Sequence, residues 1–224
     1  MLAASSWYLI HMPLDGTLLV ARHHESLWNR QGTWTGSRDV HLTPFGTKMS
    51  YEMGLQIKDF HIEQAICSMQ CRTKETLDQM LRAMQQEDVP VIRSEAINER
   101  DYGDYTGKNK HAMRDLLGQD VFDQLHREFD YPIPHGETLR VVYERVVPFY
   151  LQTVVPLLRE GKNVLVVSHG NTLRSLMKYI ESISDDGIKD VEMLFGTILI
   201  YKVDEEGKMI SRDERFTEKY ESHH

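Results

Sequence analysis

The sequence predicts a single-domain α/β fold, with a mostly parallel mixed sheet flanked by helices on both faces. Three observations support this fold class. Short apolar runs alternate with helical patterns along most of the chain. Two of these runs, 18–21 and 164–167, are apolar at every position, which is typical of strands buried on both faces of a sheet. The length of 224 residues suits one such domain with a sizeable core.

The strands of this sheet are expected at short apolar runs along the chain. These runs lie at 17–22, 65–68, 89–92, 163–168 and 197–203. Pro90 places the third strand at an edge of the sheet, because proline cannot donate to a central ladder of hydrogen bonds. The run at 197–203 is expected to be the last strand.

Helices are expected between the strands, at 44–60, 72–87, 110–128, 138–160 and 172–182. Thr43 and Pro44 open the first helix, as its N-cap and its first helical residue. Gly161 ends the longest helix, and Pro148 or Pro156 bends it. Polar, irregular loops are expected at 94–109 and 130–136.

We expect three segments along the chain: an N-terminal extension at 1–16, the folded domain at 17–210 and a C-terminal tail at 211–224. The extension lacks a basic start, and His11 and Pro13 break its apolar stretch, so a signal peptide is not expected. No apolar run approaches the roughly 20 residues that cross a bilayer. The two cysteines argue against a disulfide framework and for a reducing compartment, so we expect a cytoplasmic protein.

The formal net charge of −8 argues against nucleic acid and anionic membranes as partners, because both select a basic surface. A local basic pocket remains open, with candidate residues Arg22, Arg72, Arg100, Lys110 and Arg127. No metal site is expected, because Cys67 and Cys71 lack a second pair of ligands. They are better explained as small buried side chains.

Two histidines follow two of the predicted strands, His23 in Arg22-His23 and His169 in Ser168-His169-Gly170-Asn171. The carboxyl ends of parallel strands meet at one edge of the sheet, where ligands bind in open α/β folds. A neutral imidazole attacks phosphorus, and an adjacent guanidinium neutralises phosphoryl oxygens. The pattern therefore indicates phosphoryl transfer through a phosphohistidine. Each motif alone also fits a strand end whose polar residues satisfy backbone groups.

Two further stretches are rich in residues that serve such chemistry. Arg72 lies in the first turn of a predicted helix after Ser68, and a helix N-terminus with an arginine suits a phosphate. The loop 98–110 carries Glu99, a candidate general acid, and Tyr102 and Lys110, which suit a second anionic group. The alternative for this loop is a solvated set of turn residues and surface ion pairs.

In this order, these stretches resemble the cofactor-dependent phosphoglycerate mutases of the histidine phosphatase superfamily, over about 18–203. An Arg-His pair and a later histidine mark the superfamily as a whole. The mutase branch is indicated by Asn98-Glu99-Arg100 with Tyr102-Gly103, and by Ser26-x-Trp28-Asn29 with Thr35-Gly36.

The resemblance implies a role for each matching residue. His23 is the phosphorylated nucleophile, Arg22, Arg72 and His169 bind the transferring phosphoryl group, and Glu99 is the general acid and base. The substrate is positioned by Ser26, Asn29, Thr35, Gly36, Tyr102, Lys110, Arg127, Gly170 and Asn171. The implied reaction interconverts 3-phosphoglycerate and 2-phosphoglycerate in glycolysis and gluconeogenesis, primed by 2,3-bisphosphoglycerate and without a metal. A homodimer or a homotetramer is left open.

The sequence departs from the family pattern near the site. His24 stands where the family has glycine, and we expect it to be strained if φ is positive there, or to crowd the phosphate. His126 replaces the first of two arginines, which predicts weaker anion binding above about pH 7. Met193-Leu194-Phe195-Gly196 replaces the family's Ile-Pro-Thr-Gly before the last strand. The segment 134–137 is shorter than in the long bacterial mutases, which leaves less chain to close over the site. Two alternatives follow: a histidine-type phosphatase on small phosphoesters, or a degenerate member that acts as a binding protein.

Overall fold

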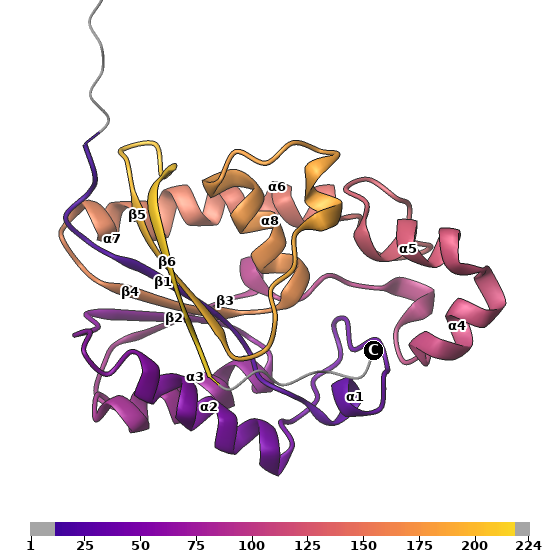
Figure 1. Cartoon of the computed structure of the whole chain (residues 1–224), viewed down its shortest axis with the longest axis horizontal. Helices are drawn as coiled ribbons and strands as arrows, with labels where there is room; N and C mark the ends of the chain where they lie inside the picture. The colour runs from indigo at the N-terminus through magenta and orange to yellow at the C-terminus, as the bar shows by residue number, and fades with distance from the viewer. Residues whose placement is uncertain (1–11, 218–224) are drawn as a thin grey trace, which may run out of the picture.

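A six-stranded mixed sheet forms the centre of the computed structural model, which describes residues 12–217 (Figure 1). The strand order is β3-β2-β4-β1-β5-β6, with bounds Leu18–Arg22 (β1), Gln64–Ser68 (β2), Val91–Ser94 (β3), Val164–Ser168 (β4), Thr197–Val203 (β5) and Met209–Phe216 (β6). Strands β1 to β4 are mutually parallel, whereas β5 runs antiparallel to β1 and β6 antiparallel to β5. The predicted mostly parallel mixed sheet and the edge position of β3 are confirmed.

The two central strands are apolar because both faces of the sheet are covered. In β1, Leu18 and Val20 belong to one hydrophobic cluster, and Leu19 and Ala21 belong to the other. Successive side chains of a strand point to opposite faces, so a strand between two helical layers is apolar at every position.

Helices on both faces complete the layers. Helices α2 (Pro44–Gln56) and α3 (Cys71–Met84) cover one face, and α6 (Leu139–Phe149), α7 (Val155–Arg159) and α8 (Gly170–Ile180) cover the other (Figure 1). Helices α4 (Lys110–Leu117) and α5 (Gln119–Arg127) project beyond the sheet, and α1 (Leu27–Arg30) is a single turn. Short 3₁₀ turns lie at Glu95–Ile97, Gly103–Tyr105 and Gly187–Asp190.

The segment that contains α4 and α5 packs in a third hydrophobic cluster, in which Tyr102, Phe122, Leu125 and Ile133 surround Trp34 from the loop after α1. The Trp34 ring stacks on Tyr102 and on Phe122, each at 5.5 Å between ring centroids. We refer to residues 102–134 as the excursion. This cluster stabilises the excursion beyond the edge of the sheet where β1 and β4 end (Figure 1), which is the edge at which the sequence predicts the two histidines.

Several helix predictions need correction, and the predicted helix 44–60 ends at Gln56. The predicted helix 110–128 is two helices, because Gly118 adopts a φ of 83°, which breaks the helical path. The predicted helix 72–87 ends at Met84, where Gln85 adopts the left-handed conformation of a C-cap. The predicted helix 138–160 contains a π-helical turn, Tyr150–Val154, which begins two residues after Pro148.

The strand β6 was missed, and the run at 197–203 is therefore not the last strand. Residues 209–216 pair with β5 at the edge of the sheet, so the sheet continues past the boundary expected at 210. Half of its residues are charged and most are exposed, which is typical of an edge strand and gives no apolar alternation. The turn that joins it to β5 is closed by the N–H of Gly207, which donates to the carbonyl of Asp204 at 2.9 Å.

The end of the predicted N-terminal extension packs on the domain. The N–H of Leu14 donates to the carbonyl of Val203 at 2.8 Å, and the N–H of Gly16 donates to that of Leu158 at 3.0 Å. Residues 1–11 of the extension and 218–224 of the tail lie outside the described residues. Within residues 12–217, none of the helices is long and apolar enough to span a bilayer.

Candidate active site

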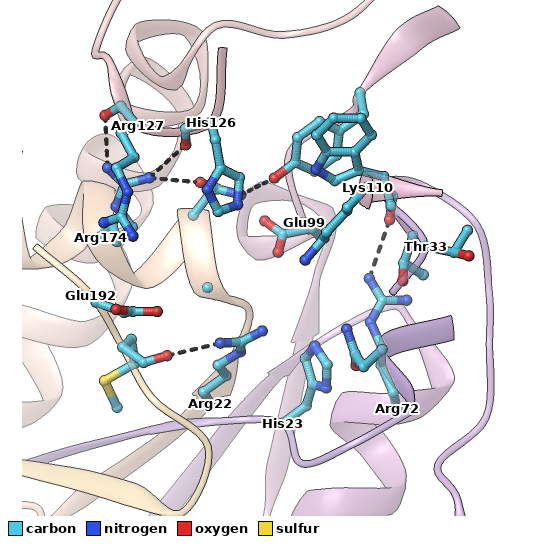
Figure 2. A pocket seen from close by; sticks show the side chains of 18 of the residues that line it. Arg22, His23, Thr33, Arg72, Glu99, Lys110, His126, Arg127, Arg174 and Glu192 are labelled. Atoms are coloured by element: carbon cyan, nitrogen blue, oxygen red, sulfur yellow. Dashed lines mark hydrogen bonds between the residues drawn. The ribbon is translucent and has the colours of Figure 1, made fainter. Parts of the chain in front are cut away.

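One pocket brings together all but two of the residues predicted for the site. It lies at the carboxyl ends of β1, β2 and β4, facing the excursion (Figure 2). The predicted residues that line it are Arg22, His23, Asn29, Thr35, Gly36, Arg72, Glu99, Tyr102, Lys110, Arg127, Gly170 and Asn171. His169 packs behind His23, and Ser26 lies outside.

His23 is held as a neutral imidazole with one ring nitrogen free. Its Nδ1 is 2.7 Å from the carbonyl oxygen of His24. A carbonyl only accepts, so Nδ1 carries the proton and Nε2 keeps its lone pair. Burial, with Arg72 and then Arg22 nearby, holds the pKa of His23 well below its usual range. The side chain is therefore a nitrogen nucleophile at neutral pH.

His169 lies against His23, because β1 and β4 pair in register. Arg22 is opposite Ser168 in that register, so both histidines follow at the same level of the sheet. The ring centroids are 5.0 Å apart, and Nε2 of His169 is hydrogen-bonded to Oγ of Ser68 at 2.8 Å. The Nδ1 of His169 is buried without a hydrogen-bond partner among the described residues. Burial, followed by Arg72, lowers the pKa of His169 well below its usual range.

Two arginines flank His23, and carbonyl oxygens hold both of them. Arg22 donates to the carbonyl of Met193 at 2.9 Å, and Arg72 donates to those of Arg38 at 2.9 Å and Gly36 at 3.2 Å. Carbonyl groups orient a guanidinium without neutralising its charge. Burial lowers the pKa of Arg72 to about 10, against the opposing effect of Glu99, so it is charged at neutral pH. The two cations are therefore available to an anion beside His23.

Glu99 faces the pocket next to Lys110 (Figure 2). Its backbone N–H donates to Oε1 of Gln70 at 2.9 Å, and its own Oε1 accepts the N–H of Arg100 at 2.8 Å. Burial and Arg22 lower the pKa of Lys110 to about 8, while Glu99 opposes that shift. The carboxyl group is thus fixed at one oxygen, in reach of a substrate that contacts both His23 and Lys110.

The opposite wall of the pocket is also basic. Nδ2 of Asn171 donates to the hydroxyl of Tyr102 at 2.8 Å, and Oδ1 of Asn171 accepts from Arg174 at 3.0 Å. Arg174 also donates to the carbonyls of Arg127 and Ile188, each at 2.8 Å. Burial lowers the pKa of Arg174 to about 10, which leaves it charged at neutral pH. This wall suits a second anionic group on the substrate.

His126 lies on this wall but does not behave as expected. Burial, followed by Lys110 and Arg174, holds its pKa well below the usual range. The imidazole is therefore already neutral at pH 7, and the predicted loss of its charge above about pH 7 is wrong for the free protein. Burial and the neighbouring cations, neither of which the sequence shows, are the reason.

Ser26 was assigned to substrate binding, but its hydroxyl is used within the fold. It accepts the N–H of Asn29 at 3.4 Å and donates to Oδ1 of Asn29 at 2.7 Å, which makes it the N-cap of α1. Serine three residues before an amide side chain is a capping pattern, and this signal was available in the sequence. Ser26 supports the site by holding Asn29, which does line the pocket.

His24 turns away from the pocket, and its backbone does not adopt a positive φ. Its Nδ1 accepts the N–H of Glu25 at 2.8 Å, and its ring packs against Phe45 and Phe195. Burial, followed by Arg22, lowers the pKa of His24 to about 4. The expected backbone strain and the crowding of the phosphate are therefore both absent.

Several residues that line the pocket were not among the predicted site residues. They are Thr33, Trp34, His126, Arg174, Val191, Glu192 and Met193. Arg174 lies three residues after Asn171 in α8, so the two side chains share one face of the helix. This spacing was a signal in the sequence for Arg174. Glu192 and its neighbours come from the loop before β5, where the resemblance marks Met193-Leu194-Phe195-Gly196 as near the site but nothing singles out Glu192.

The described residues offer one candidate cluster of metal ligands, and it is outside this pocket. His41, Cys71 and Glu75 lie close together at the start of α3. His41 and Glu75 form an ion pair there, and Glu75 also accepts the N–H of Leu42 at 2.8 Å. These contacts explain the cluster without a metal.

Comparison with known proteins agrees with the class that this fold and site define. Residues 18–213 match the model of the histidine phosphatase superfamily, branch 1, and the chain belongs to that superfamily. The chain is 34% identical over 202 residues to the 2,3-bisphosphoglycerate-dependent phosphoglycerate mutase of Parvibaculum lavamentivorans, covering 89% of this chain and 96% of that one. It is 37% identical over 191 residues to the mutase of the same name from Xanthobacter autotrophicus, covering 84% and 92%.

Solved structures with this fold include both mutases and phosphatases. YhfR from Bacillus stearothermophilus has a TM-score of 0.76 at 26% identity, covering 87% of this chain and 94% of that one. A phosphoglycerate mutase from Bacillus anthracis has a TM-score of 0.69 at 20% identity, covering 90% and 92%. A putative α-ribazole-5′-P phosphatase from Escherichia coli has a TM-score of 0.73 at 20% identity, covering 90% and 95%. The last two likenesses concern the fold alone.

Proposed function

We propose that this protein is a phosphoglycerate mutase that interconverts 3-phosphoglycerate and 2-phosphoglycerate through a phosphohistidine at His23. The observation that carries this proposal is the pairing of two basic walls across one pocket. Arg22 and Arg72 flank a neutral His23 on one side, and Lys110, Arg127 and Arg174 lie on the other. A substrate with anionic groups at both ends fits such a pocket. The names of the relatives at 34–37% identity support the same activity.

Buried polar atoms without partners support a fit to phosphorylated ligands. Among the described residues, these atoms include Nε of Arg22, Nε of Arg72, Nδ1 of His169 and Oγ1 of Thr35. Buried polar atoms in a folded protein normally have a partner, so several orphans around one pocket indicate a ligand with many acceptors. 2,3-Bisphosphoglycerate, when bound, would supply the phosphoryl group that primes His23.

The residues divide the chemistry between them. Nε2 of His23 attacks the phosphorus atom, so a nitrogen–phosphorus bond forms while the phosphorus–oxygen ester bond breaks. Glu99 donates its proton to the departing alkoxide, and in the reverse step it takes the proton of the attacking hydroxyl. Arg22, Arg72 and His169 stabilise the charge on the equatorial oxygens of the transferring group. Lys110, Arg127, Asn171 and Tyr102 hold the remainder of the substrate.

The experiment that tests the proposal is a coupled assay with 3-phosphoglycerate, run with and without 2,3-bisphosphoglycerate, in which released inorganic phosphate is also followed. Fast interconversion that depends on the bisphosphate, with little phosphate released, is the expected result. His23→Ala is the control, and it should abolish both turnover and acid-labile phosphorylation of the protein. No interconversion by the wild-type protein would contradict the proposal.

A second candidate function is that of a histidine-type phosphatase on small phosphoesters. Glu192 favours it, because a carboxylate beside Arg22 and Lys110 opposes a second anionic group. The neutral state of His126 acts in the same direction. Release of inorganic phosphate without interconversion in the same assay would support this function. Silence in both measurements would leave a degenerate member that only binds its ligand.

A further inference from the structure

Two departures from the family pattern contact each other in the structure. Phe195 stands at a family threonine, and His24 stands at a family glycine, more than 160 residues apart in the sequence. Their rings are stacked, with centroids 5.4 Å apart and an interplanar angle of 30°. A side chain at 24 and an aromatic ring at 195 therefore form one packing unit, which the family residues cannot form.

The ring of Phe195 also contacts the catalytic arginine. Cζ of Arg22 lies 4.0 Å from the centroid of the Phe195 ring, which is a cation–π contact. The ring centroid of His23 is 6.1 Å from that of Phe195, in an edge-on arrangement. Phe195 is thus next to both the nucleophile and the cation that flanks it.

The loop before β5 holds Arg22 in two ways. The carbonyl of Met193 accepts from one terminal nitrogen at 2.9 Å, and the Phe195 ring lies under the guanidinium plane. Neither contact neutralises the charge, and Nε of Arg22 is buried without a partner among the described residues. The guanidinium is therefore oriented in advance, with donors left for a phosphoryl group. Such preorganisation is what stabilises a charged transition state.

The position of Phe195 argues against a role in packing the core. The ring is only partly buried, and it lies outside the three hydrophobic clusters of the described residues. It borders a second cavity that adjoins the pocket and shares Arg22, Lys110 and Arg127 with it. A large aromatic side chain at a partly open site is explained by its contacts with Arg22 and His24.

We propose that Phe195 is a positioning residue that holds Arg22 in place for phosphoryl transfer, and that His24 acts through it by stacking on its ring. This inference rests on the proposed phosphohistidine chemistry. It explains why the glycine and threonine of the family are both replaced in this chain. A cation–π contact changes a rate or an affinity by about twofold at an exposed site and by more than 10-fold at a desolvated one, so a partly buried contact is expected to contribute on the order of 10-fold.

The test uses inorganic vanadate, which adopts the five-coordinate geometry of a transferring phosphoryl group. We expect Phe195→Thr and Phe195→Leu to weaken vanadate binding on the order of 10-fold, and to slow single-turnover phosphorylation of His23 by a similar factor. Phe195→Tyr keeps the ring face and should restore both to near the wild-type values. Leu194→Ala is the matched control, because Leu194 is an exposed neighbour in the same loop. Unchanged melting temperatures would show that all four variants fold.

A double-mutant cycle tests the part assigned to His24. His24→Gly should weaken vanadate binding less than Phe195→Thr does, and the double variant should be no weaker than Phe195→Thr alone. Fully additive effects would show that His24 does not act through Phe195. Wild-type affinity in Phe195→Leu would overturn the positioning role. Failure of the wild-type protein to become phosphorylated would instead contradict the proposed function itself.

Discussion

The backbone N–H of Glu99 donates a hydrogen bond to the side-chain oxygen of Gln70 at 2.9 Å. The NH₂ group of the same side chain donates to the carbonyl of Gly36 at 2.9 Å. One buried amide therefore links the loop of Glu99, the proposed general acid, to the loop that also anchors Arg72. Because both loops lack regular secondary structure at these points, the amide sets their separation.

We expect Gln70→Ala to lower kcat on the order of 10-fold, because Glu99 loses the contact that fixes its backbone. Gln86→Ala is the matched control. Gln86 also bridges two backbone groups, the N–H of Ile62 and the carbonyl of Phe60, but far from the pocket. Both variants should lose stability, and a loss of kcat in both would show that Gln70 has no special relation to Glu99. Steady-state kinetics and thermal melts measure the two effects.

Glu99→Gln should lower turnover by on the order of 10²–10⁴-fold, since an amide cannot transfer a proton to or from the substrate. Its side-chain oxygen still accepts the N–H of Arg100, so the loop should keep its conformation. Glu95→Gln, on an exposed carboxylate of the preceding 3₁₀ turn, is the control. A Glu99→Gln rate equal to that of the control would move the proton transfer to another group.

The pKa of Lys110, lowered to about 8 by burial and by Arg22, predicts a pH-dependent affinity. Above that pH the side chain loses its charge, so kcat/KM for phosphoglycerate should fall between pH 7 and 9. Lys110→Arg keeps a fixed charge, because guanidinium does not titrate in this range, and its profile should be flatter. The affinity falls as the pH rises because the ammonium group becomes neutral, and the lowered pKa of Lys110 brings this fall into the range between pH 7 and 9. Identical profiles for the two proteins would remove Lys110 from the binding of the free substrate.

Glu192→Gln should lower KM for 3-phosphoglycerate by about two- to fivefold, a small effect because the carboxylate is exposed. The carboxylate lies near Arg22 (Figure 2), and its charge partly offsets those of Arg22 and Lys110. Asp190→Asn, two residues earlier and also exposed, is the control for a general change in net charge. An equal change of KM in both variants would indicate long-range electrostatics alone. The difference should shrink at high ionic strength.

The strands and the paired histidines were predictable because their signals are local. Two apolar runs, each ending in a histidine, predict parallel strands whose ends meet, and the structure brings the two rings to 5.0 Å. Arg72 and Glu99 were predictable because each lies near a strand end or in a loop of unusual composition. The resemblance to a known family placed the remaining predicted residues, and Ser26 is the one whose side chain turns to capping.

What the sequence did not predict depends on contacts between distant segments. Glu192 lines the pocket from the loop before β5. Its sequence neighbours do not predict that a carboxylate lies at the site. The neutral protonation state of His126 depends on its burial and then on Lys110 and Arg174, which belong to other helices. Strand β6 has no apolar alternation because neither of its faces is buried. In each case the determining partner is far away in the chain.

The cluster under the excursion shares no residue with the two clusters that cover the faces of the sheet. The strand ends and the first turn of α3 carry His23, the proposed nucleophile, and its flanking arginines, whereas the excursion supplies Tyr102, Lys110, His126 and Arg127 to the opposite wall. Substitutions in that cluster should therefore change the wall that faces His23 more than they change the packing around His23 itself. With this arrangement, we expect substrate preference to change more readily by mutation than the proposed phosphoryl-transfer chemistry.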